Sequence, residues 1–147
     1  FRGPGRANDP CPYATLIALK ALWLLPEQQD EAACQTGIEC LLGHWQHQRE
    51  RKIYLFGIGT DFRKLKYPFI WYDILHFAEV LTRFPAARHD PRLAEALRII
   101  VNKQDGQGRF TPESVWTAWK AWDFGQKKVP SPWITYLVLH MIKRMHS

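Results

Sequence analysis

The sequence predicts an all-α protein built from tandem helical hairpins. One reason is a phrase that the chain contains twice, with each matched pair of residues 62 positions apart. The matched residues are Asp61, Phe62, Lys66, Pro68 and Trp71 in the first copy and Asp123, Phe124, Lys128, Pro130 and Trp133 in the second. A second reason is that apolar residues in the intervening segments recur at helical spacing. Internal repeats with this periodicity are typical of stacked helical units.

The first part of the chain predicts one complete hairpin. Residues 12–25 are apolar on nearly every side, as expected for a helix that is covered on most sides. A second helix is expected from Asp30, a good N-cap residue, to about Gln48, with apolar residues along one face only. The apolar residues of that face are Cys34, Ile38, Leu41, Leu42 and Trp45.

The same alternation continues to the end of the chain. Residues 69–84 are again rich in large apolar side chains, and Asp90-Pro91 is a start signal for an amphipathic helix that reaches Val101. A last helix is expected over 132–145. Broadly apolar first helices and one-sided second helices predict an inner and an outer layer.

Two long connections, 49–68 and 105–131, lead from outer helices to the next inner helices. We expect both connections on one rim of the array. Long loops in compact domains are often functional. We expect irregular backbone over 116–122, despite the three-residue spacing of its tryptophans. Within the repeated phrase, Asp61 and Asp123 are expected to hold the incoming loops by accepting hydrogen bonds from backbone N–H groups.

Composition predicts one packed domain of 147 residues. The net charge is +6, but the basic residues are scattered without a recognition motif, so no nucleic-acid partner is expected. No apolar run reaches the roughly 18 residues of a membrane span. Cys11, Cys34 and Cys40 form no obvious disulfide framework, which favours the cytoplasm. Because the chain starts with Phe1 and its first repeat is incomplete, we expect residues 1–147 to be the C-terminal part of a longer protein.

A motif follows the second outer helix, with Gln104-Asp105-Gly106 and then Gly108-Arg109-Phe110. Together with the alternating helices, this motif resembles the repeat of the prenyltransferase and squalene-cyclase superfamily. The tail from Asn102 through Lys143 looks like uncharacterised bacterial proteins assigned to that superfamily. The resemblance implies part of an α/α toroid in which these residues tie a turn to its neighbouring helix. It also implies an isoprenoid-like or lipid-like ligand in a central cavity.

The catalytic motifs of that superfamily are not found in this chain, which has no DxDD cluster and no DDxxD segment. Protein prenyltransferases of the superfamily bind zinc through Asp, Cys and His. Asp9 and Cys11 match the first half of that pattern, but His76 is about two turns out of register. In the other interpretation Asp9 starts a helix and Cys11 is a small buried residue. Likewise, Cys40 and His44 are either a reactive pair or a core thiol beside a histidine. No cofactor is expected.

Asp73 and His76 are the candidate catalytic residues. With Glu79 and Arg83 they form one polar stripe on an otherwise apolar helix. If this stripe faces a cavity, Asp73 and His76 form an acid/base pair. In the alternative interpretation the stripe is a solvated face with an ion pair inside the helix.

Trp71, Trp133 and Tyr13 occupy equivalent positions near the starts of inner helices, and they are the candidate ligand-binding residues. Their rings either line a hydrophobic cavity or pack successive hairpins together. Two functions remain open. One is binding of an apolar ligand in a cavity that missing N-terminal repeats or another subunit complete. The other is a non-catalytic helical scaffold that binds a protein partner or associates with itself.

Overall fold

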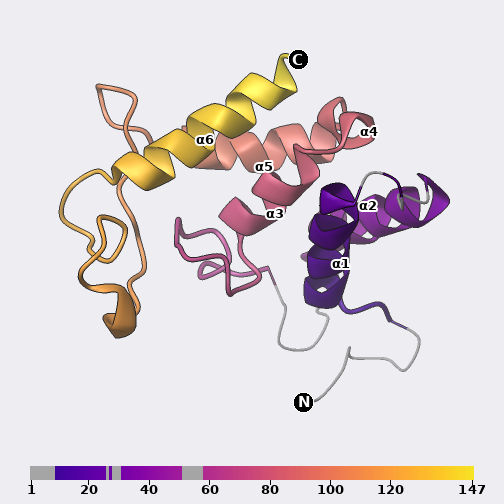
Figure 1. Cartoon of the computed structure of the whole chain (residues 1–147), viewed down its shortest axis with the longest axis horizontal. Coiled ribbons are helices and arrows are strands. Elements are labelled where there is room, and N and C mark those ends of the chain that lie inside the picture. Colours follow the sequence, from indigo (N-terminus) through magenta and orange to yellow (C-terminus); the bar gives the residue numbers. More distant parts are fainter. Residues whose placement is uncertain (1–8, 26, 28–30, 51–57) are drawn as a thin grey trace.

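The computed structural model describes residues 9–25, 27, 31–50 and 58–147. The longer helices within these ranges are α1 (Pro12–Leu24), α2 (Glu31–Gln46), α3 (Ile74–Leu81), α5 (Pro91–Val101) and α6 (Pro132–Met145). A single turn, α4 (Pro85–Arg88), precedes α5, and a 3₁₀ turn covers Thr117–Trp119. These ranges contain no β-strand, so the predicted all-α class is confirmed (Figure 1).

The helices pack in two layers. α3 contacts both α1 and α6, and these three helices form the inner row. α2 packs on α1, α5 packs on α3, and the two outer helices α2 and α5 contact each other. The apolar patterns predict this alternation. The closure of such an array into a toroid stays a prediction.

The core lies between the layers around Trp45, Phe62 and Phe77. The ring centroid of Trp45 is 5.9 Å from that of Phe77 and 6.1 Å from that of Phe62. Phe62 and Phe124, the aromatic residues of the repeated phrase, are both buried. Burial of one such side chain contributes about 1.5–3 kcal/mol. The repeated phenylalanines therefore anchor each long loop close to the start of the next inner helix.

The third predicted helix begins later than expected, at Ile74 instead of residue 69. Asp73 caps α3, because its carboxylate accepts hydrogen bonds from the N–H groups of Leu75 at 3.0 Å and His76 at 2.9 Å. The N–H of Ile74 donates to the carbonyl of Phe62 at 2.8 Å. This bond holds the non-helical segment that precedes α3 against the preceding loop.

The repeated tryptophans consequently lie in different local structures. Trp71 precedes α3, whereas Trp133 lies in the first turn of α6. Ser131 caps α6 by accepting a hydrogen bond from the N–H of Ile134 at 3.1 Å. A constant offset of 62 residues therefore matches the loop anchors better than it matches the helix starts.

The motif that follows α5 ties its turn to α6. The Asp105 carboxylate accepts hydrogen bonds from the N–H groups of Gln107 and Arg109, both at 2.9 Å. Phe110 is fully buried, and its N–H donates to the Thr135 hydroxyl of α6 at 3.0 Å. The buried Phe110 therefore fixes this turn against α6.

α1 is less covered than its composition predicts. Its buried residues are Pro12, Leu16 and Leu19, whereas the opposite face leaves apolar side chains in solvent. That face consists of Ala14, Ile17, Ala18, Ala21, Leu24 and Leu25. The reason is position, because α1 stands at the end of the inner row and contacts one inner helix, α3, within the described structure.

α2 begins at Glu31, and its expected cap, Asp30, lies outside the described residues. Each helix in the described part of the chain is too short or too polar to cross a lipid bilayer.

Candidate functional site

The two long loops meet at Leu65 and Glu113. The N–H of Glu113 donates to the Leu65 carbonyl at 2.8 Å, and the N–H of Leu65 donates to the Glu113 carboxylate at 2.7 Å. Lys103 donates to both oxygens of the same carboxylate, at 2.8 and 2.7 Å. This clamp places the segment before α3 beside the segment after α5. Both segments therefore lie on one rim, as the sequence predicts.

The loops form a pocket of about 660 Å³, which we call the Trp71 pocket. Small-molecule sites usually have volumes of about 300–1,000 Å³. It is lined by Asp61, Lys66, Tyr67, Pro68, Trp71, Tyr72, Ser114, Val115 and Trp116. Trp71 and Trp116 are 50% and 48% exposed, and their ring centroids are 5.8 Å apart. The buried Lys66 ammonium donates to Asp61 at 2.7 Å and lowers the pKa of that carboxyl. The Trp71 pocket thus combines an open aromatic wall with one ion pair.

A smaller pocket of about 300 Å³ adjoins the first, and we call it the Trp133 pocket. It is lined by Tyr67, Pro68, Trp119, Trp122, Asp123, Phe124 and Trp133. The Tyr67 ring stands edge-on to Phe124 and Trp133, with centroid distances of 4.7 and 5.6 Å. Tyr67 and Pro68 line both pockets, so the pockets adjoin at these residues, and we call the two together the aromatic groove.

Asp123 holds the loop that carries the tryptophans of the Trp133 pocket. Its carboxylate accepts hydrogen bonds from the Ser131 hydroxyl and, at 3.0 Å, from the Trp133 N–H. Asp123 therefore holds its loop through a backbone N–H, as predicted. Asp61 differs, because the side-chain partners recorded for its carboxylate are Lys64 and Lys66. The backbone bond at the equivalent place comes instead from Ile74 to Phe62.

The sequence-predicted binding residues have different locations. Trp71 and Trp133 line the two halves of the aromatic groove. Tyr13 lines neither pocket, and its hydroxyl donates to the Ile70 carbonyl at 3.1 Å. Tyr13 thus acts behind the groove, where it holds the backbone next to Trp71.

Asp73 and His76 are fully buried and line neither pocket. The imidazole of His76 stacks on Phe69 at 4.7 Å, and its Nδ1–H donates to the Trp71 carbonyl at 2.9 Å. Burial raises the pKa of Asp73 to about 7 and lowers the pKa of His76 to about 4. The recorded bond between the two residues joins the His76 backbone to the Asp73 carboxylate. Their role in the structure is to start α3 and to fix the backbone of Trp71.

In the remainder of the predicted polar stripe Glu79 is buried and Arg83 is half-buried, so the stripe is not a solvated face. Glu79 forms the expected ion pair with Arg83 at 2.6 Å and a second with Arg144 of α6 at 3.3 Å. The Arg83 guanidinium lies over the Trp23 ring at 4.1 Å from its centroid. These contacts connect α3 to α1 and α6, which explains how charged groups remain inside the inner row.

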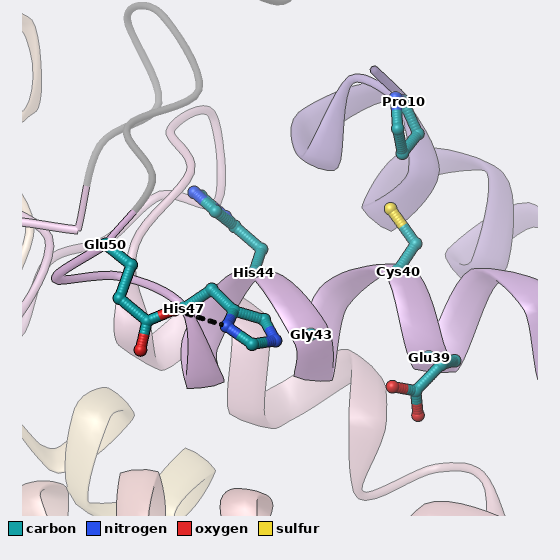
Figure 2. A pocket seen from close by; sticks show the side chains of 7 residues that line it. All are labelled: Pro10, Glu39, Cys40, Gly43, His44, His47 and Glu50. Carbon is teal, nitrogen blue, oxygen red and sulfur yellow. Dashed lines mark hydrogen bonds and ion pairs between the residues drawn. The ribbon is translucent and has the colours of Figure 1, made fainter. Parts of the chain in front are cut away.

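A polar pair that the sequence does not reveal lies behind the Trp71 pocket. His44 of α2 and Tyr72 share a hydrogen bond of 2.8 Å between Nδ1 and the phenol oxygen, and both are buried. Burial lowers the pKa of His44 to about 4 and raises the pKa of Tyr72 well above its usual value. His44 also borders a pocket of about 350 Å³ (Figure 2). The two residues are far apart in sequence and share no motif, so no sequence signal indicates the pair.

The thiol in this pocket is not activated. Cys40 points toward Pro10 (Figure 2), and its Sγ donates to the Thr15 hydroxyl at 3.6 Å. Burial raises the pKa of the Cys40 thiol, which keeps it protonated at neutral pH. The structure therefore favours an unreactive, half-buried thiol over the reactive pair with His44.

The zinc hypothesis involves Asp9, Cys11 and His76. Cys11 is the N-cap residue of α1, and the His76 imidazole is held between Phe69 and the Trp71 carbonyl. Across the described residues, no three His, Cys, Asp or Glu side chains are grouped to hold a metal ion. The described geometry therefore gives this hypothesis no support.

Comparison of the chain with protein-family models, with curated proteins and with solved structures gave no match. The superfamily resemblance thus stays a prediction from the sequence motifs, and the candidate site rests on its own geometry.

Proposed function

We propose that this protein binds an apolar, isoprenoid-like or lipid-like molecule along the aromatic groove. The observation that supports this most is the position of Trp71 and Trp133. The two tryptophans come from the two copies of the repeated phrase, and they line adjoining pockets that share Tyr67 and Pro68. A concave site lined mainly by aromatic rings buries most of an apolar ligand and removes its surface from water.

The polar groups of the groove suit orientation of the ligand better than a reaction on it. Lys66 and Asp61 are bound to each other at one end, and the Asp123 carboxylate is bound to the start of α6. These groups are available to hold a terminal hydroxyl or similar polar end of the ligand. Asp73, whose raised pKa is typical of an acid, lies behind the groove wall and not in it. Our proposal is therefore binding, without an assigned chemical step.

Equilibrium dialysis with radiolabelled farnesol tests the proposal. We expect saturable binding to the wild-type chain and at least about tenfold weaker binding after Trp71→Ala or Trp133→Ala, which corresponds to about 1.4 kcal/mol. Trp23→Ala is the matched control, because Trp23 is also partly exposed but lies on α1, outside the groove. Absence of saturable binding, or an equal loss in the Trp23 variant, would contradict the proposal.

Self-association is a second candidate function, and the exposed face of α1 supports it. This uncharged face stands at one end of the inner row, and α6 at the other end exposes Trp133, Tyr136 and Leu139. Because inner helices already pack side by side within the chain, α6 of one copy against α1 of another would continue the row. Sedimentation velocity of Leu24→Glu tests this, with the exposed Ala94→Glu of α5 as control. A wild-type monomer at all concentrations would exclude it.

A further inference from the structure

We propose that residues 114–131, here called the basic aromatic loop, dock the protein on an anionic lipid surface. The loop joins α5 to α6 and extends beyond the helices as the orange segment of Figure 1. This inference goes beyond binding in the groove and does not depend on it.

The loop presents large apolar side chains to solvent. Trp122 and Val129 are 56% and 58% exposed, and Trp116 is exposed to a similar degree. Indole rings favour the interface between lipid headgroups and acyl chains, because one edge of the ring is polar and the remainder is apolar. Exposed Trp and Val on a projecting loop therefore fit shallow insertion into a bilayer surface.

Positive charge accompanies these apolar groups. Lys120, Lys127 and Lys128 alternate with them along the loop, whose acidic residues are Asp123 and Glu113 at its edge. In the described structure none of the three lysines pairs with an acidic side chain, whereas Glu113 is already paired with Lys103. Each Lys close to an anionic membrane contributes about 1 kcal/mol of attraction. The charge of the loop is thus complementary to phosphatidylserine headgroups.

The loop is ordered before it meets a partner. The Gln126 side chain accepts hydrogen bonds from the N–H groups of Lys128 at 2.6 Å and Val129 at 2.9 Å. Trp122 stacks on the buried Phe124, with ring centroids 5.7 Å apart. Little conformational entropy is then lost on docking, because the exposed groups are already held in place.

Single-stranded nucleic acid also binds aromatic rings and lysines, so the two classes of partner must be compared. Bases stack on indoles, but the exposed aliphatic side chain of Val129 offers nothing to a base or a phosphate. Aliphatic groups do gain from contact with acyl chains. The mixture of Trp, aliphatic groups and Lys therefore favours a lipid surface.

Vesicle sedimentation tests the proposal with the whole chain. We expect binding to vesicles of phosphatidylcholine mixed with phosphatidylserine, and much weaker binding to phosphatidylcholine alone. Lys127→Glu with Lys128→Glu should weaken binding to the mixed vesicles by about tenfold or more. The matched control is Arg49→Glu with Arg98→Glu, which makes the same change in net charge at exposed positions of the outer layer. This control should bind within about twofold of the wild type, because its charges lie outside the loop.

A second variant tests the proposal even if the double lysine variant does not fold. Trp122→Ala should weaken vesicle binding by removing inserted apolar surface, and circular dichroism checks its helices. Trp71→Ala should lose farnesol binding but keep vesicle binding, which separates this inference from the proposed function. Equal binding to both vesicle types, an equal loss in the Arg49/Arg98 control, or tighter binding to poly(U) RNA than to vesicles would overturn the proposal.

Discussion

Glu113 grips the backbone of Leu65 from two sides, because its N–H donates to the Leu65 carbonyl while its carboxylate accepts from the Leu65 N–H. The two loops that build the aromatic groove are joined at this point. The Glu113 side chain therefore helps to hold together the two loops that form the groove.

Replacement of Glu113 should loosen this clamp. Glu113→Ala leaves the Leu65 N–H without its acceptor, and Leu65 is fully buried. We expect a loss of about 1–3 kcal/mol in the free energy of unfolding, measured by urea denaturation. Glu113→Gln keeps an acceptor for Leu65 and loses only the partly exposed pair with Lys103, so its loss should be below about 1 kcal/mol. Equal losses in both variants would mean that the backbone bond contributes nothing.

Gly125 allows the basic aromatic loop to close. A Cβ atom at this position would lie 1.8 Å from the Trp119 carbonyl oxygen, so Gly125→Ala must displace backbone. We expect weaker farnesol binding in equilibrium dialysis and a lower melting temperature. Gly106→Ala is the control, since a Cβ there meets no atom within 4 Å. Normal farnesol binding by the Gly125 variant would show that the Trp133 pocket does not hold the ligand.

The hydrogen bond between His44 and Tyr72 should be worth about 1–3 kcal/mol, because its loss leaves a buried nitrogen unpaired. His44 Nε2 is already buried without a partner in the described structure. Tyr72→Phe should therefore destabilise the protein in urea denaturation without changing the shape of the Trp71 pocket. Tyr72→Phe, His44→Phe and the double variant together form a double-mutant cycle. Strictly additive losses in that cycle would contradict the bond.

Buried titrating groups predict how stability depends on pH. His44 and His76 have a pKa of about 4 in the folded state and about 6.5 when unfolded. Their contribution is fully present above pH 6.5 and is lost as the pH falls toward 4, because the unfolded chain then binds protons that the folded protein does not. In the Asp73→Asn variant, where the opposing titration of Asp73 is absent, urea denaturation should accordingly give a lower free energy of unfolding at pH 5 than at pH 7. Invariance over that range would contradict the buried neutral histidines.

Asp73 acts in the opposite direction. Its pKa of about 7 lies above the usual 3.8, so its contribution is fully present below pH 3.8 and is lost as the pH rises through 7. Asp73→Asn removes this loss. Relative to the wild type, the variant should gain up to about 4 kcal/mol between pH 4 and pH 8.

Asp90 provides the control for this experiment. It also caps a helix, but hydrogen bonds from Arg92 lower its pKa. Asp90→Asn should therefore lose stability relative to the wild type as the pH rises through the acidic range. A pH-independent difference for Asp73→Asn, measured by the same urea series, would show that the Asp73 carboxyl is ionised normally.

The helices and their two layers could be predicted from the sequence. Apolar periodicity and caps such as Asp90 are local, so the helix classes and the two layers follow from them. The repeated Phe62 and Phe124 correctly mark where each loop reaches an inner helix. The start of α3 was missed by five residues, because a tertiary bond from Ile74 to Phe62 holds the preceding segment away from helical geometry.

The site could be predicted only in part for the same physical reason. Trp71 and Trp133 are conspicuous in the repeat and do line the groove. Tyr13 has the equivalent place in sequence, but it lines neither pocket and its hydroxyl donates to the Ile70 carbonyl. The Glu113 clamp and the pair of His44 with Tyr72 join residues that are distant in sequence, and such contacts leave no local pattern.

The central claim is that the aromatic groove is the binding site, and fluorine NMR of protein labelled with 5-fluorotryptophan tests it most directly. The chain has seven tryptophans. Trp71, Trp116, Trp119, Trp122 and Trp133 line the groove, whereas Trp23 and Trp45 do not. Titration with farnesol should shift the resonances of the groove tryptophans and leave those of Trp23 and Trp45 unchanged. Shifts confined to Trp23 or Trp45, or no shift at saturating farnesol, would contradict the account.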